Sequence, residues 1–407
     1  MHGITGVVVA AAVLAGSAGV AQARTAPRDP LSRDARITAA ADLAGVGECR
    51  IADATPDNGA DPGSVRMGTL GFPRAEYVGT PSSLRIAVLP LDFADLPFRE
   101  SDHAALRRAA REVVRYYDAM SYGRAVVTVS VATMSDVVRM PAPARTYGVF
   151  AEYADIVRIA ADALAAAPPS LQLGTYDMVA LETARDDGSR FWPVAMPVVS
   201  PIPSSSGPVG GAVLAGGWQA ANWRAIAHEV AHVWLGFEDL YDMTPPPAYD
   251  GTFREYDLMN SFRGAAPELT AWNRFLAGWL DDRQVRCVVP TTRRRTVHYL
   301  SAISDRSDLP KAVVRPLGPG RTLVVESRRN RGYDRVEDSA LVYVVDSTRR
   351  SGDGPIEARG ELTTDRGRRP SRERWRVPVG RTVTVEGVTI RLLASSRFGD
   401  LVEVGQG

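Results

Sequence analysis

The chain has 407 residues, which is too many for one simple hydrophobic core, so two or three domains are expected. Hydrophobic residues make up 45% of the chain and charged residues 23%, the composition of a soluble globular protein. The net charge of +1 excludes a global electrostatic field that would recruit nucleic acid or an anionic membrane, and we expect neither as a partner.

The first residues of the chain have the pattern of an export signal. Residues 4–21 are apolar and rich in small side chains, and Ala21-Gln22-Ala23 fits an A-x-A cleavage site. The alternative is a single membrane anchor, but the run is short and no other stretch is long enough to span a bilayer. We therefore expect a signal peptide at 1–23, and a secreted, extracellular protein without a stable membrane anchor after cleavage.

Alternating strands and helices follow a polar N-terminal stretch. Residues 24–80 are rich in Ala, Asp, Gly and Pro, which indicates a pro-segment or an extended N-terminal arm. Hydrophobic periodicity predicts strands at 84–93, 125–131 and 176–181, and helices at 102–119 and 154–166. This alternation of strands and helices indicates a layered α/β or α+β structure, with a sheet beside the helix predicted at 218–236.

Two contrasting segments come next. Residues 201–217 are rich in Pro, Ser and Gly, which predicts a loop or irregular edge, either at the rim of a cleft or as a flexible connection. Residues 218–236 are apolar nearly all round, which predicts a buried helix. Gly236 would end this helix, because glycine adopts the left-handed conformation found after helix C-termini.

The predicted buried helix carries the sequence H-E-V-A-H. Helix positions four apart share one face, so His228 and His232 can present two imidazoles to one metal ion. Glu229 beside them can act as general base toward a water that the metal activates. The alternative is a helix with two satisfied core histidines. Burying these polar groups is costly unless something pairs with them, and a zinc ion would do so.

The predicted secondary structure changes near residue 282. Short strands separated by turns and charged loops predict a β-rich C-terminal domain at 283–407. The predicted strands are 296–300, 311–314, 321–326, 340–345, 382–385 and 388–393.

The sequence contains two cysteines, Cys49 and Cys287. In an exported protein they most simply form a disulfide bond, which would tie the N-terminal stretch to the start of the C-terminal domain. Two alternatives remain: both thiols are free, or Cys49 caps the metal in a latent precursor.

Several segments beyond the histidine motif resemble the immune inhibitor A family of secreted zinc metallopeptidases. They cover the family's G-x-x-D-x-Y-D segment, its D-x-M-[SN] turn, its P-x-L-[ST]-A-W…G-W helix, its Y…S-Y-G-[KR] element and its E-x-R…G-x-D…Y-x-V-D segment. The matching residues are 236–242, 256–261, 267–280, 116–124 and 326–346. Two departures stand out: Ala231 replaces the family's glycine, and one residue is inserted after His232.

The resemblance implies an α+β fold, with a zincin-like catalytic domain at 81–282 (a mixed sheet plus an active-site helix) before the β-rich domain. It implies a metal-binding hydrolase, namely a zinc-dependent protease that cleaves protein or peptide substrates with Glu229 as general base. We expect the protein to be a monomer. One alternative is a catalytically weak, metallopeptidase-like binding protein, because the two departures blur the third zinc ligand. Another is a metal-dependent hydrolase with a non-peptide substrate.

Catalytic zinc takes three protein ligands and keeps one open position. No histidine lies close after His232, since the next is His298, so we expect a carboxylate. The spacing in related proteases favours Glu238, whereas alignment on D-L-Y-D favours Asp239, which we prefer; Glu255 is the remaining candidate. Alternatively, the acidic turn binds Ca²⁺, because hard cations favour carboxylates.

The resemblance also places Met259 in a turn beneath the zinc, where its role is packing. Tyr241 or Tyr256 could donate a hydrogen bond to the oxyanion of the transition state, and the sequence does not choose between them.

Overall fold

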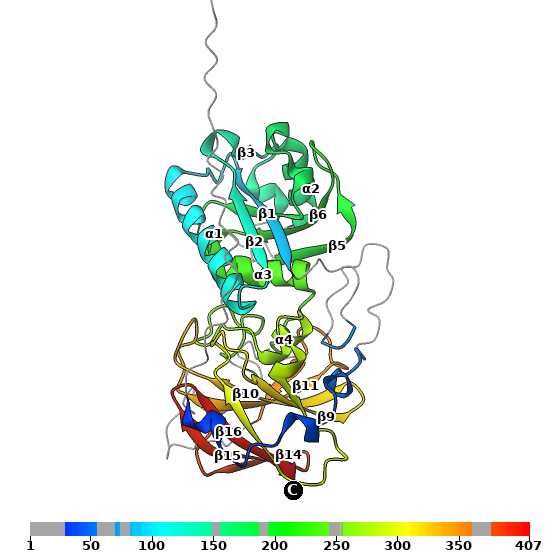
Figure 1. The fold of residues 1–407 in the computed structure, drawn as a ribbon. Helices are drawn as coiled ribbons and strands as arrows, with labels where there is room; N and C mark the ends of the chain where they lie inside the picture. Colours follow the sequence, from blue (N-terminus) through cyan, green and yellow to red (C-terminus); the bar gives the residue numbers. More distant parts are fainter. Residues whose placement is uncertain are drawn as a thin grey trace, which may run out of the picture.

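The computed structural model describes residues 29–54, 70–73, 82–148, 155–186, 194–243, 253, 255–359 and 376–407 (Figure 1). The predicted signal peptide at 1–23 lies outside the described residues. Within the part of the chain that is described, no helix is both long and apolar enough to cross a membrane.

A mixed sheet forms the first lobe, which contains the described residues between 82 and 243 (Figure 1). The strands run in the order β2-β1-β4-β6-β5, with β3 beside β1. All their pairings are parallel except that of β5 with β6, so an antiparallel strand ends the sheet on that side. The strands are β1 (Ser83–Asp92), β2 (Val126–Val131), β3 (Val138–Arg139), β4 (Met178–Thr183), β5 (Val194–Ile202) and β6 (Val209–Ala215).

The helices of this lobe cover the sheet. They are α1 (Glu100–Met120), α2 (Ile156–Ala166) and α3 (Trp223–Leu235). Every residue of β4 is buried, as expected for a parallel strand covered on both faces. The hydroxyl of Tyr117 on α1 donates to the carbonyl of Ala227 on α3 at 2.5 Å, so these two helices pack against each other.

The predicted loop at 201–217 is wrong in its second half, which β6 occupies. The pattern was misleading because Gly210 and Gly211 interrupt the hydrophobic run. A Cβ atom on Gly210 would lie 2.7 Å from the carbonyl oxygen of Asp177, so glycine here allows a close backbone approach beside β4. The rest of β6 is apolar and buried between its neighbours.

Two further sheets form the second lobe, and they confirm a β-rich C-terminal region (Figure 1). One sheet has the order β12-β11-β10-β9-β7, with β13 beside β11, and the other has the order β14-β15-β16-β8. Valine, leucine and isoleucine side chains from both sheets share one buried cluster between them. The strands are β7 (Val285–Cys287), β8 (Thr296–Ser301), β9 (Ala312–Gly318), β10 (Arg321–Arg328), β11 (Ser339–Asp346), β12 (Ile356–Ala358), β13 (Arg376–Val377), β14 (Thr382–Val385), β15 (Val388–Ser396) and β16 (Gly399–Gln406).

The short helix α4 (Ala271–Leu276) lies between the first lobe and the sheets of the second lobe in Figure 1. It is buried along its whole length and is preceded by the turn at 256–261. The overall architecture is therefore mixed α and β, consistent with the α+β class expected from the sequence.

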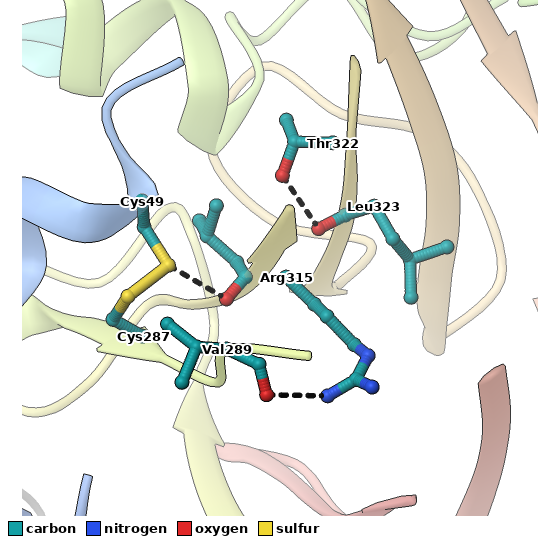
Figure 2. Close-up of a disulfide and its surroundings, with 7 residues drawn as sticks. Cys49, Cys287, Val289, Arg315, Thr322 and Leu323 are labelled. Carbon is teal, nitrogen blue, oxygen red and sulfur yellow. Dashed lines mark hydrogen bonds between the residues drawn. A yellow bond between two sulfur atoms is a disulfide. The ribbon is translucent and has the colours of Figure 1, made fainter. Parts of the chain in front are cut away.

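The N-terminal arm packs on the second lobe. Residues 29–54 contain short 3₁₀ turns, and the backbone N–H of Thr38 donates to the carbonyl of Val297 at 2.8 Å. The predicted disulfide between Cys49 and Cys287 is confirmed, with 5.7 Å between the two Cα atoms. Figure 2 shows this disulfide and its surroundings. The Cys49 sulfur lies 3.2 Å from the carbonyl oxygen of Val314 on β9. The arm is thus bonded covalently to β7.

We predict that replacing both cysteines by serine lowers the free energy of unfolding by about 2–5 kcal/mol. The bond joins positions 238 residues apart, so its loss releases a long loop in the unfolded chain. Denaturant titration of the variant beside the parent protein measures the difference. Intact mass after alkylation provides the control, and two alkylated thiols on the unreduced parent would contradict the bond.

Candidate metal centre

The local sequence explains how α3 begins and ends. The Asn222 side chain caps the first turn by accepting a hydrogen bond from the backbone N–H of Arg224 at 3.1 Å. At the other end Gly236 has a φ of +65°, and its N–H donates to the carbonyl of His232 at 3.1 Å. The predicted helix end at Gly236 is therefore confirmed, and the chain turns sharply after the second histidine.

The two histidines face each other inside the protein. Both are buried, and their Nε2 atoms are 3.2 Å apart. The Nδ1 atom of His228 lies 2.9 Å from the carbonyl oxygen of Leu258, and that of His232 lies 2.5 Å from the carbonyl oxygen of Phe237. A carbonyl oxygen can only accept, so each Nδ1 carries the proton. In the neutral rings, each Nε2 therefore presents a lone pair.

Asp239 completes a triangle of donor atoms. Its Oδ1 atom lies 3.0 Å from Nε2 of His228 and 3.2 Å from Nε2 of His232. A tetrahedral zinc ion with bonds of about 2.0–2.1 Å places its ligand atoms roughly 3.3 Å apart, so one such ion fits this triangle. The two imidazoles are the neighbours of this buried oxygen, which has no conventional hydrogen bond within the described structure. Three lone pairs facing one point require a cation or protons among them.

The electrostatics of the triangle favour positive charge. Burial alone would lower the pKa of His228, but Asp239 and the charge of Glu229 outweigh it and raise the pKa to about 9. Burial opposes ionisation of Asp239, yet His232 and His228 hold the pKa of its carboxyl well below the usual range. Without a metal ion, the charges around the triangle thus favour the protonated form of the His228 ring.

Glu229 lies beside the triangle. Its Oε1 atom is 4.0 Å from Nε2 of His228, farther than Oδ1 of Asp239. His228, Glu229 and His232 form a buried group whose ligand atoms all lie within 4.8 Å of one another, and this group could hold a metal ion. The position of Glu229 leaves it close to the centre without crowding it.

The other predicted ligands lie in different surroundings. Glu238 is buried, and its Oε2 atom has no hydrogen-bond partner within the described structure. Burial raises the pKa of Glu238 well above its usual value, and the carboxylates of Asp53, Asp239 and Asp353 raise it further. Glu255 precedes the turn at 256–261, and its carbonyl accepts from the N–H of Ala266 at 3.1 Å. Of the candidate carboxylates, Asp239 is the one in contact with both imidazoles.

Met259 is fully buried in the turn at 256–261, and its carbonyl accepts from Leu240 N–H at 3.1 Å. The ring of Tyr256 lies 5.7 Å from the guanidinium of Arg328, a residue of β10. Burial raises the pKa of Tyr256 to about 12. This tyrosine therefore faces the second lobe, which weakens its prediction as an oxyanion donor.

Sequence reasoning missed the two carbonyl groups that orient the histidines. Leu258 and Phe237 contribute backbone atoms, which any residue type could supply, so no side-chain pattern marks them. In comparisons with known proteins, no family model matches the chain and no curated protein matches it. The assignment to a family therefore stays a prediction.

We predict that zinc binding at pH 7 releases at least about one proton per ion, because His228 must lose the proton on Nε2 before that atom can bind the metal. The pKa of about 9 means that this ring is mostly protonated at pH 7 in the metal-free protein. Zinc affinity should therefore fall as the pH drops below 9. Calorimetric titration in two buffers of different ionisation enthalpy measures the release, and equal heats in both would contradict it.

Proposed function

We infer that the protein is a zinc peptidase with a zincin-like catalytic domain. More narrowly, we infer a secreted endopeptidase of the immune inhibitor A type. The observation that carries the proposal is the triangle of Nε2, Nε2 and Oδ1 atoms, with sides of 3.0–3.2 Å, beside a buried glutamate. The sheet order, with an antiparallel strand at one edge and α3 packed against it, supports the same class.

The donor set favours zinc over calcium. Two imidazole nitrogens and one carboxylate oxygen suit Zn²⁺, whereas Ca²⁺ takes about six to eight oxygen ligands. His228, His232 and Asp239 would hold the ion and leave one position open. When bound there, zinc supplies Lewis-acid chemistry: it polarises a carbonyl and makes water more acidic. A second, calcium-binding role for the acidic turn remains a prediction from the sequence.

Glu229 is the proposed general base. It is buried beside the triangle, within 4.0 Å of the Nε2 atom of His228, so it is close enough to contact a water at the open position. Its carboxylate would take a proton from that water and deliver it to the leaving amine of the cleaved peptide bond. Asp239 and the histidines would keep the same geometry throughout, because backbone carbonyls fix both rings.

A peptide is the substrate that the fold accommodates most readily. Strand β5 ends the sheet on one side among the described strands, and it packs against α3. An extended peptide could add to such an edge through main-chain hydrogen bonds, a mode that depends little on side-chain identity. Zinc content by mass spectrometry, together with casein cleavage blocked by a chelator, tests the proposal. Bound zinc without cleavage would favour the binding-protein or non-peptide alternative.

We predict that Glu229→Gln lowers kcat/KM by roughly 100-fold or more while zinc stays bound, because the change removes the proton acceptor and no ligand. Hydrolysis of a quenched fluorescent peptide and zinc content should be measured on the same preparation. The matched control is Glu112→Gln on α1, a half-exposed glutamate that pairs with Arg115, and this variant should keep normal activity. Loss of zinc in Glu229→Gln, or near-normal cleavage by it, would contradict the assignment of Glu229 as the general base.

We predict that Asp239→Ala weakens zinc binding by more than about 100-fold, beyond the ~10–100-fold that a change outside the ligand set costs. Glu238→Gln should have a small effect, because burial favours the neutral form of the Glu238 carboxyl and glutamine resembles that form. Titration against a competing chelator compares the two variants. A severe effect of Glu238→Gln would make Glu238 the third ligand instead of Asp239. If neither variant weakens zinc binding, Glu255 becomes the candidate for the third ligand.

A further inference from the structure

We propose that Asp257 is a positioning residue for the metal centre: its carboxylate fixes the peptide group that orients His228. The proposal rests on the metal site of the proposed function. It concerns a residue that does not touch the ion, and it depends on a chain of hydrogen bonds between the turn at 256–261 and α3.

The peptide group between Leu258 and Met259 links the carboxylate to the imidazole. The N–H of this group, on Met259, donates to Oδ1 of Asp257 at 2.9 Å. Its C=O, on Leu258, accepts from Nδ1–H of His228 at 2.9 Å. The peptide unit is planar, so holding its N–H also fixes the direction of its C=O. Asp257 thereby sets where the imidazole ring must lie.

The carboxylate of Asp257 is itself held firmly. Its Oδ2 atom accepts from the backbone N–H of Thr270 at 2.7 Å and from the side-chain amide of Asn273 at 2.9 Å. Asp257 is fully buried, and its own N–H donates to the carbonyl of Ala266 at 2.9 Å. Its oxygens are therefore acceptors for three donors and cannot rotate away without leaving buried N–H groups unpaired.

The backbone of Asp257 is also unusual. Its φ of +69° lies in the left-handed region, which few residues with a side chain adopt and which aspartate adopts more readily than most. A glycine would adopt this conformation more easily, but it would provide no carboxylate. Aspartate provides both the left-handed backbone and the acceptor for the Met259 N–H.

The same hydrogen bonds that position the His228 ring also affect how strongly its Nε2 atom binds a metal ion. A negative charge at the N–H end of a peptide group makes its carbonyl oxygen a stronger acceptor, because hydrogen bonds in series polarise one another. A stronger acceptor at Nδ1 increases the electron density at Nε2 and so its strength as a metal ligand. His232 provides the comparison within the same site, since its Nδ1 bonds to the carbonyl of Phe237 instead.

The experiment uses the full-length protein labelled with ¹⁵N in its histidine rings and loaded with zinc. In Asp257→Asn, we expect the Nδ1–H proton of His228 to move upfield and zinc affinity to fall by roughly 10–100-fold. The Nδ1–H signal of His232 should stay in place. The two signals are assigned from their through-space contacts to Leu258 and Phe237. A loss of stability alone would not move one ring signal and spare the other.

The matched control is Asp400→Asn, another fully buried aspartate, which pairs with Arg329 on the second lobe. It should leave both ring signals and zinc affinity unchanged. If Asp257→Asn fails to fold, Asn273→Ala, which removes one of the donors that hold Oδ2, should change the His228 signal by a smaller amount and leave the His232 signal in place.

The outcomes separate the two proposals. A parent protein that binds no zinc overturns the proposed function and this inference together. If the parent binds zinc but Asp257→Asn leaves the His228 signal and the zinc affinity unchanged, only the positioning role is overturned. Where Asp257→Asn does not fold, the same result in Asn273→Ala overturns it.

Discussion

Three lone pairs directed at one buried point are the constraint on which the rest of this structure depends. The Nε2 atoms of His228 and His232 and the Oδ1 atom of Asp239 lie 3.0–3.2 Å from one another, away from bulk water. Such an arrangement is unfavourable unless positive charge lies among the atoms. The surrounding elements hold it in place from three directions: α3 from the sheet side, the segment after Gly236, and the turn around Leu258.

The second lobe contributes to this arrangement although it provides none of the three atoms. The backbone of Asp239 donates to the hydroxyl of Ser351 at 2.8 Å, and its carbonyl accepts from Gly352 at 3.0 Å. On the other side, Glu326 of β10 accepts from the N–H of Ala271 at the start of α4, which follows the Thr270 contact to Asp257. Buried carboxylates and arginines at this junction are costly to desolvate, so each depends on its partners. We therefore expect the isolated first lobe to hold the site poorly.

The sequence predicted those parts of the site that follow from periodicity or counting. Helical spacing paired the two histidines, glycine chemistry placed the helix end at Gly236, and two cysteines in one chain suggested their bond. Periodicity could not separate Glu238 from Asp239, because it stops at the helix end and adjacent side chains in an irregular turn point in different directions. Composition failed at β6, where Gly210 serves a close backbone contact. Hydrogen bonds to backbone carbonyls have no signature in side-chain identity.

The disulfide between Cys49 and Cys287 has a mechanical consequence. All strands of the first sheet, and the helices α1 to α4, lie between these two positions in the chain. They form a closed covalent ring whose two ends meet on the second lobe. Tension applied to the two termini would pass from the N-terminal arm through the sulfur atoms into β7 and bypass the ring. The histidine helix would therefore be shielded from pulling forces for as long as the bond is oxidised, and reduction would place it directly in the line of load.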